Sequence, residues 1–142
     1  KNIKSEIIVT VSTNLGKQTT QFWEKYNQDL SNVQVFLDEN NFAKNFKRSS
    51  SKIFESFNFY NHHQKKKLKI NHHIGIYGYK VGTLSKISKL KITDREKTEK
   101  LEQIRWFENN YKIKSITTKD IHFGFSINTK EDLERLKKQN IL

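Results

Sequence analysis

The chain has 142 residues, a formal net charge of +12 at pH 7 and no cysteine. Its length fits one domain with one core, and the lack of cysteine excludes disulfides and thiolate metal sites. No segment approaches the roughly 18 apolar residues that a membrane-spanning helix needs, and no signal-peptide pattern is visible. We therefore expect a cytoplasmic protein without a membrane partner.

The positive charge comes almost entirely from lysine, because the only arginines are at positions 48, 95, 105 and 135. A basic chain can attract nucleic acid through its field. Dedicated nucleic-acid readers favour arginine, however, because its planar fork makes bidentate contacts. Lysine, asparagine and isoleucine are abundant while proline and methionine are absent, as AT-rich coding would produce. We expect compositional drift, with a basic nucleic-acid-binding protein as the alternative.

The first part of the chain predicts a strand, a helix and a hairpin. Residues 6–12 are a β-branched run bounded by polar residues, which is typical of a strand. Aromatic residues at near-helical spacing predict an amphipathic helix over 20–30, with its rings in the core. Strands are expected at 33–37 and 42–47. The turn between them, at 38–41, contains residues that tolerate left-handed backbone.

Residues 49–71 form the least structured part of the sequence. The segment has too many aromatic rings for a free linker, so we expect it to pack on the domain itself or on a partner subunit. The lysine run at 65–67 is interpreted as a solvated loop. The histidine pairs at 62–63 and 72–73 could indicate a metal site, but they lack the carboxylate or thiolate spacing that would sharpen it.

The next part predicts a strand at 72–80 and a helix at 81–89. Thr93 and Glu96 form a capping box, in which the threonine hydroxyl accepts from the Glu96 amide while the glutamate reaches back. The helix that this box opens is expected to end at the stop signal 109–110. Its core side chains are expected at positions 101, 104 and 107.

The last predicted elements are strands at 112–118 and 121–127, and a helix at 131–138 that Thr129 caps. This helix has its acids in the first turn and its lysines in the last, as the macrodipole favours. Mixed strands and helices in this order predict an α/β layer architecture. Ligands are then expected near the strand ends.

Four blocks of the sequence together resemble one family. They are VQVFLDENNFAKNFKRS (33–49), HHIGIYGYK (72–80), EKTEKLEQIRWFENNYKI (96–113) and SINTKEDLERL (126–136). Their order is similar to that in the 3-deoxy-manno-octulosonate cytidylyltransferases, or CMP-Kdo synthetases. The resemblance implies a nucleotidyltransferase-type, Rossmann-like α/β sandwich with a mixed sheet, usually a homodimer. It also implies transfer of CMP from CTP to the acidic sugar Kdo for lipopolysaccharide synthesis, with release of pyrophosphate and help from Mg²⁺.

The resemblance implies sugar-binding roles for five residues. Arg48 matches the family's sugar-site arginine, whose permanently charged fork suits a carboxylate. His73 and Tyr77 match the HIGIY strand, and both can exchange hydrogen bonds with sugar hydroxyls. Glu102 and Gln103 match the element whose polar groups hold those hydroxyls, and such sites reject analogues that leave buried groups unpaired.

Other polar residues in these blocks receive different interpretations. Arg105 is either a partner of a helix carboxylate or a ligand contact, and Glu96 and Glu99 are interpreted as capping and surface residues. Asn128 stands where many family members have a magnesium-binding aspartate, and its neutral oxygen supplies no charge. No catalytic residue is assigned.

The family's CTP-binding elements are not found in the chain. These elements are a basic loop with Arg, Ser and Lys, and an acidic metal-binding segment. We therefore expect residues 1–142 to be a single partial domain, a C-terminal portion with the sugar-binding and dimerisation parts. Such a chain should not turn over alone, because phosphoryl transfer depends on cations around the triphosphate. The alternatives are an activator of another acidic sugar, such as sialic acid, and a non-catalytic relative.

Overall fold

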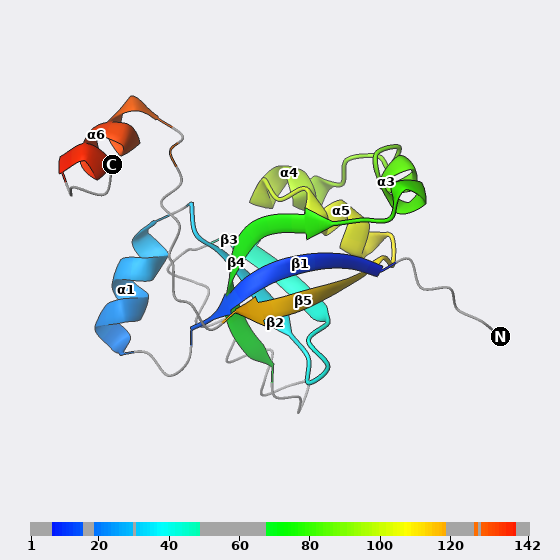
Figure 1. Ribbon diagram of the computed structural model, residues 1–142, viewed down its shortest axis with the longest axis horizontal. Coiled ribbons are helices and arrows are strands. Elements are labelled where there is room, and N and C mark those ends of the chain that lie inside the picture. The colour runs from blue at the N-terminus through cyan, green and yellow to red at the C-terminus, as the bar shows by residue number, and fades with distance from the viewer. Residues whose placement is uncertain are drawn as a thin grey trace.

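The structure is a computed structural model, and the residues that it describes are 7–15, 19–29, 31–48, 68–118, 127 and 129–138. Its framework is a five-stranded sheet with the strand order β3-β2-β4-β1-β5 (Figure 1). The strands are β1 (Ile7–Asn14), β2 (Val33–Leu37), β3 (Ala43–Arg48), β4 (Lys69–Gly78) and β5 (Lys112–Thr118). The helices are α1 (Thr20–Gln28), α3 (Val81–Ile87), α4 (Asp94–Glu99), α5 (Gln103–Glu108) and α6 (Lys130–Lys138).

The sheet is mixed and strongly curled. β1 pairs antiparallel with β4 and parallel with β5, while β2 pairs antiparallel with β3 and β4. The tip of the β2–β3 hairpin reaches the far edge of the sheet, where the Ser115 amide donates to the Asn41 carbonyl at 2.9 Å. Phe42 also forms a β-bridge with Lys114. The two edges of the sheet therefore meet at the hairpin tip.

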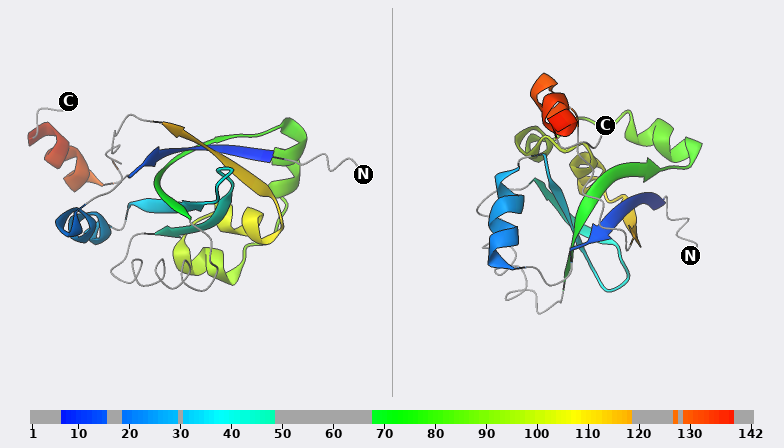
Figure 2. Two further views of the ribbon diagram at one scale, coloured as in Figure 1. Left: turned by 90° about the horizontal axis from the view of Figure 1, so that it is seen from below. Right: turned by 60° about the vertical axis from the view of Figure 1, so that its left-hand side comes forward.

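The main core lies on one face of the sheet, here called the inner face, which carries Ile8, Val35 and Ile113. Helices α3, α4 and α5 pack on this side (Figure 2). Full burial of each large apolar side chain contributes about 1.5–3 kcal/mol, so this layer dominates the stability. The buried members of the core are Ile8, Val35, Leu37, Ala43, Phe46, Ile87, Leu101, Ile104, Trp106 and Ile113.

The opposite face, here called the outer face, is covered at one end by α1. The Tyr26 hydroxyl of α1 lies 2.6 Å from His72 Nδ1 of β4 in a buried hydrogen bond. Phe36 packs in a second, smaller cluster with Leu68 and Ile70. Helix α6 lies apart from the sheet, at the end of the molecule where α1 is found (Figure 1). None of the helices in the described ranges is long and apolar enough to cross a membrane.

The α/β architecture, the hairpin and most of the predicted elements are confirmed. β2, β3 and β5 lie at or within one residue of the expected positions, and α1, α3 and α6 end or begin within two residues of theirs. Asn41 in the hairpin turn has a φ of 61°, the left-handed conformation that asparagine tolerates. The Thr93 hydroxyl accepts from the Glu96 amide at 3.2 Å, which confirms that half of the capping box.

Two boundaries differ from the prediction. β4 begins at Lys69 because this end of the segment expected to be irregular pairs with Leu37 of β2. The single helix expected to end before 109–110 is instead α4 and α5, because Lys100 adopts a left-handed conformation with a φ of 53° that ends α4. Residues 49–67 and almost all of the strand expected at 121–127 lie outside the described residues.

Candidate functional site

His73 lies on the inner face of β4 and is only 7% exposed. Its Nε2 is 2.8 Å from the Thr10 hydroxyl of β1, and that hydroxyl donates its own proton to the Ile76 carbonyl at 2.8 Å. Nε2 must therefore carry a proton and donate to Thr10, which leaves Nδ1 as the acceptor nitrogen. Burial lowers the pKa of His73 to about 4, and the neighbouring His72 acts in the same direction. His73 is thus a neutral imidazole at pH 7.

Tyr77 lies two pleats further along β4, on the same face. Its ring is 5.2 Å from the His73 ring and 5.1 Å from the Trp106 ring, centroid to centroid. The Tyr77 hydroxyl is buried, and no residue in the described part of the chain gives it a hydrogen bond. Burial raises the pKa of Tyr77, while the nearby Thr10 hydroxyl acts weakly the other way. The site therefore holds a buried, neutral hydroxyl close to Thr10 and beside a neutral histidine.

Aromatic rings fix these two side chains in place. Phe46 of β3 packs edge-on against His73 at 5.2 Å, and Tyr79 stacks on Tyr77 at 5.9 Å. Trp106 of α5 packs edge-on against both tyrosines. Such pairs contribute about 0.5–1.5 kcal/mol each beyond the area that they bury. They hold the His73 and Tyr77 rings in one orientation.

Glu102 and Gln103 are brought to the same region by the junction between α4 and α5. The charge of Glu102 helps to raise the pKa of Tyr77 and of Tyr79, after burial, so its carboxylate lies near both rings. Glu102 is exposed and accepts from Arg105 Nη2 at 3.1 Å. Gln103 is buried in the first turn of α5. Glu102, at the start of α5, is therefore a neighbour of Tyr77 of β4 in space.

Arg105 is a partner of helix carboxylates, which is one of the two roles that the sequence left open. Its Nε lies 3.0 Å from Glu96 Oε2, and both side chains are largely buried. The same guanidinium contacts Glu102 and the Leu90 carbonyl. Glu96 therefore faces Arg105 and is buried, in addition to its place in the cap of α4.

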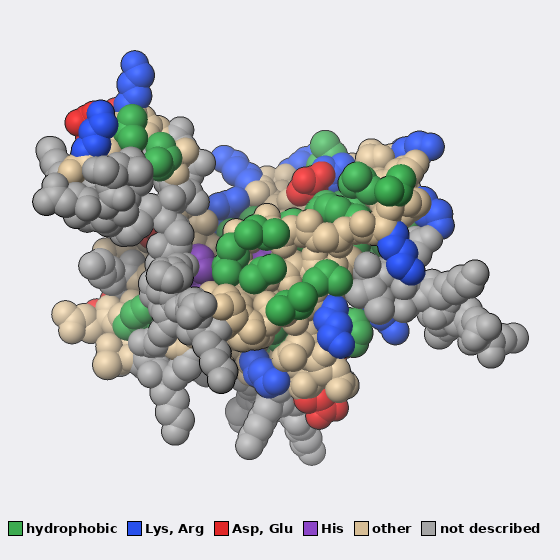
Figure 3. Space-filling model, in the orientation of Figure 1, with side chains coloured by type: hydrophobic (Ala, Val, Ile, Leu, Met, Phe, Trp, Pro, Cys, Tyr) green, Lys and Arg blue, Asp and Glu red, His purple; other side chains and the backbone are tan. Residues whose placement is uncertain are grey.

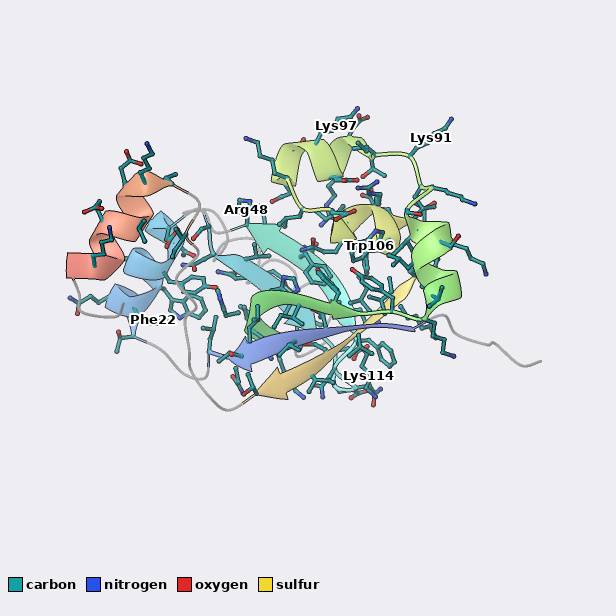
Figure 4. The ribbon with its side chains drawn as sticks, turned by 45° about the horizontal axis from the view of Figure 1, so that its top comes forward. Phe22, Arg48, Lys91, Lys97, Trp106 and Lys114 are labelled. Atoms are coloured by element: carbon teal, nitrogen blue, oxygen red, sulfur yellow. The ribbon has the colours of Figure 1, made fainter. Side chains whose placement is uncertain are left out.

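Arg48 lies at the end of β3, next to the α4–α5 junction (Figure 4). Its Nε donates to the Glu99 carbonyl at 3.1 Å and its Nη2 to the Lys100 carbonyl at 2.8 Å. These carbonyls belong to the last turn of α4, where a cation is favoured by the helix dipole. The end of α4 thus orients Arg48. Lys100, whose carbonyl accepts from Arg48, lies two residues before Glu102 in the sequence.

Sequence reasoning missed Thr10 and Trp106. Thr10 is fully buried and contacts His73, a pair separated by 63 residues in sequence. The sequence signal that could have identified Thr10 is its position as a polar residue inside the apolar run of β1. Trp106 is buried in the main core beside the expected Leu101 and Ile104, and the expected Phe107 is partly buried and packs against the same core.

The described residues do not form a metal site. They contain no group of three or more His, Asp or Glu side chains that could hold an ion. His72 and His73 are adjacent on β4, so their side chains point to opposite faces of the sheet. Their partners, Tyr26 and Thr10, lie on different elements. Magnesium therefore stays a prediction, and Asn128 lies outside the described residues.

The fold is that of a nucleotidyltransferase-type α/β protein. The structure superposes with a TM-score of 0.64 on CMP:2-keto-3-deoxy-manno-octonic acid synthetase complexed with CTP, at 21% identity over 94% of this chain and 48% of that one. A family model described as cytidylyltransferase matches residues 3–116. The chain therefore belongs to the cytidylyltransferase family.

Curated relatives with sequence similarity are named 3-deoxy-manno-octulosonate cytidylyltransferase. The one from Francisella philomiragia is 36% identical over 135 residues, which cover 95% of this chain and 51% of that protein. The one from Fusobacterium nucleatum is 37% identical over 117 residues, which cover 78% of this chain and 43% of that protein. The chain thus spans about half the length of the curated relatives that it matches.

Proposed function

We propose that this chain supplies the sugar-binding part of a 3-deoxy-manno-octulosonate cytidylyltransferase. In that reaction the anomeric hydroxyl of Kdo attacks the α-phosphorus of CTP. The bond from that phosphorus to the bridging oxygen breaks, pyrophosphate leaves, and the hydroxyl proton is released. The observation that carries the proposal is that His73 and Tyr77 lie together on β4 with Glu102 near Tyr77, in a chain that belongs to the cytidylyltransferase family.

The hydrogen-bonding groups at this site suit a polyhydroxylated sugar. Tyr77 offers a buried hydroxyl that lacks a partner among the described residues. His73 offers a neutral acceptor nitrogen, because its other nitrogen donates to Thr10. Glu102 is an exposed carboxylate that can accept from a sugar hydroxyl. These groups can discriminate among sugars, because a substrate lacking a matching hydroxyl leaves them unpaired.

Arg48 is proposed to bind the carboxylate of the acidic sugar. The guanidinium has five N–H donors in a fork that matches a carboxylate. Its bonds to the Glu99 and Lys100 carbonyls fix the plane of that fork. Arg48 should therefore contribute to sugar binding through both its charge and its fixed orientation.

Isothermal titration with Kdo tests the proposal directly. Tyr77→Phe should weaken Kdo binding about tenfold, the equivalent of one hydrogen bond. The same change should leave thermal stability equal or slightly higher, because it removes a buried hydroxyl that lacks a described partner. Tyr79→Phe is the matched control, since this ring stacks on Tyr77 and is less buried. Tighter binding of sialic acid than of Kdo would make the substrate assignment wrong.

An activity assay tests the reaction itself. Pyrophosphate release from CTP should require Kdo and a polypeptide that supplies the rest of the cytidylyltransferase fold, because this chain spans about half of its relatives. Arg48→Ala should impair sugar use more than CTP binding. Equal loss of both would contradict the role proposed for Arg48.

We also propose that the whole protein is a cytoplasmic homodimer that contributes to lipopolysaccharide synthesis. The aromatic segment within 49–71 is the proposed dimer contact. Light scattering of the chain with and without changes to its rings tests this assembly. A requirement for magnesium stays a prediction based on the family resemblance.

A further inference from the structure

Strand β4 has a β-bulge between His73 and Tyr77. Their Cα partners on β1 are Ser12 and Thr10, which lie only two positions apart, and the register shifts between these partners. β4 therefore has three residues, 74–76, where β1 has a single one. A bulge with one extra residue would turn one of the two side chains to the other face of the sheet. Because this bulge has an even excess, His73 and Tyr77 stay on the same face.

The bulge brings the His73 and Tyr77 rings together. In a regular strand, residues four positions apart are separated by about 13 Å, since each residue advances the chain by about 3.3 Å. The centroids of the two rings are only 5.2 Å apart. The bulge therefore makes neighbours of two side chains that a regular strand would hold far from each other.

Gly75 lies in the middle of the bulge and allows its backbone conformation. Its φ is 83°, in the left-handed region that residues with a side chain rarely adopt. Gly75 is exposed, and a Cβ atom built on it would meet nothing within 4 Å in the described structure. Ile76 is 60% exposed, and Figure 3 shows hydrophobic side chains at the surface over this part of the sheet. Packing from outside by the described residues therefore does not hold the bulge.

The Thr10 hydroxyl holds the bulge from the inner face of the sheet. It accepts from His73 Nε2 at the start of the bulge and donates to the Ile76 carbonyl at its end, each at 2.8 Å. Thr10 is fully buried, so water does not compete for these bonds. A hydroxyl has one proton to donate, and its use at Ile76 keeps the His73 proton on Nε2. One side chain thus sets both the bulge and the protonated nitrogen of the histidine.

We propose that Gly75 and Thr10 are positioning residues of the sugar site, which hold His73 and Tyr77 side by side so that one sugar can contact both. This inference rests on the proposed function of the site. Neither residue has to touch the sugar, because Gly75 has no side chain and the Thr10 hydroxyl is engaged by His73 and Ile76. Their effect on binding passes through His73 and Tyr77.

Two variants of Thr10 separate its hydroxyl from its size. Thr10→Val keeps the shape and removes both bonds, whereas Thr10→Ser keeps the hydroxyl. In isothermal titration, Thr10→Val should weaken Kdo binding at least about tenfold and Thr10→Ser less than about threefold. Nitrogen-15 NMR should place the His73 proton on Nε2 in the parent chain and in Thr10→Ser, and on both nitrogens in Thr10→Val. The proposal is overturned if Thr10→Val changes neither readout, or if both variants lose equal affinity.

Gly75→Ala tests the bulge itself, and Gly82→Ala is its matched control. Gly82 is exposed in α3, a Cβ there would also meet nothing within 4 Å, and its φ is not left-handed. Gly75→Ala should weaken Kdo binding about tenfold and reduce the nuclear Overhauser effects between the His73 and Tyr77 rings. Gly82→Ala should change neither.

Gly75→Asn provides a second variant of the bulge, and circular dichroism establishes that each variant folds. Asparagine tolerates left-handed backbone, so Gly75→Asn should bind Kdo more tightly than Gly75→Ala does. Full Kdo affinity and an intact ring contact in Gly75→Ala would overturn the role of Gly75. Equal loss in Gly75→Asn and Gly75→Ala would also contradict it, because the backbone conformation would then not be the cause.

The NMR readouts keep this proposal separate from the sugar-binding role. If the ring contact and the Nε2 proton are present in the parent chain and lost in the variants while the parent ignores Kdo, the positioning stands and the proposed function fails. If the parent chain binds Kdo and the Thr10 and Gly75 variants bind it equally well, the function stands and the positioning fails.

Discussion

His73 is held in its neutral form by its surroundings. Its Nε2 donates to the Thr10 hydroxyl, whose own proton is donated to the Ile76 carbonyl. The imidazole ring lies between the Phe46 and Tyr77 rings. A protonated imidazole there would carry an unsolvated charge, which is why burial lowers the pKa to about 4. The folded protein therefore binds a proton at His73 more weakly than the unfolded chain, whose histidine pKa is about 6.5.

This difference predicts a loss of stability in acid. Above about pH 6.5 His73 is neutral in both states, and as the pH falls to about 4 the unfolded chain takes up a proton that the folded protein does not. His73 should thus reduce the free energy of unfolding by about 3 kcal/mol across this window. Urea titrations from pH 7 to pH 4 measure it. His73→Gln should flatten the dependence, and a slope unchanged by that substitution would contradict the prediction.

At the scale of elements, the break between α4 and α5 places the polar end of the site. Lys100 has a left-handed backbone, and its amide donates to the Glu96 carbonyl at 2.7 Å to close the turn. The chain can then bury Leu101 and start α5 at Gln103. A continuous helix would carry Glu102 and Gln103 on a different axis, away from the end of β4.

The same break predicts that glycine is favoured at position 100. A non-glycine residue pays about 1 kcal/mol for a left-handed conformation, so Lys100→Gly should stabilise the fold by about 0.5–1 kcal/mol. Lys97→Gly is the control, because this residue lies inside α4 and glycine there should cost about 1 kcal/mol. Thermal unfolding of both variants measures the difference. Equal destabilisation would show that the turn at Lys100 is not under conformational strain.

Arg48 joins two elements, since it extends from β3 to the last carbonyls of α4. Arg48→Ala should lower the free energy of unfolding by about 2 kcal/mol, because charge-assisted bonds to partly buried carbonyls are lost. Arg48→Lys should recover only part of this loss, since one ammonium cannot match both directions of the fork. Chemical denaturation of the two variants provides the measurement, and identical stability of Arg48→Ala and the parent chain would refute the bracing role.

At the scale of the whole molecule, the curl of the sheet depends on the hairpin tip. The bridge between Phe42 and Lys114 and the bond from Ser115 to Asn41 close the outer edge of β5. The Lys114 ammonium also lies 5.4 Å from the centre of the Phe42 ring, a cation–π contact. An uncovered strand edge can pair with other chains, so the tip protects β5.

Phe42→Ala should therefore open this edge. The expected result is a loss of about 2 kcal/mol of stability, faster amide hydrogen exchange in β5 and increased aggregation. Ile92→Ala is a suitable control, because Ile92 is 57% exposed and is not part of the sheet. Unchanged exchange in β5 after loss of the Phe42 ring would show that the hairpin tip does not close the sheet.

Much of this architecture follows from local patterns. The β-branched run of β1, the turn residues at 38–41 and the cap at Thr93 act between near neighbours, so their effects can be predicted without a partner. The prediction of one long helix after that cap was wrong for the opposite reason. A left-handed residue at Lys100 is locally unfavourable, and burial of Leu101 against distant strands offsets its cost.

The sequence by itself determined the order of the elements, the α/β class and the blocks that resemble a cytidylyltransferase. It also identified His73 and Tyr77 on one strand. Only the tertiary structure decided that Thr10 orients His73, that Trp106 packs on Tyr77, and that Ile76 and Ile116 are exposed. The physical reason is that these contacts depend on strand register and on which face each element covers. Both are set by packing between residues far apart in the chain.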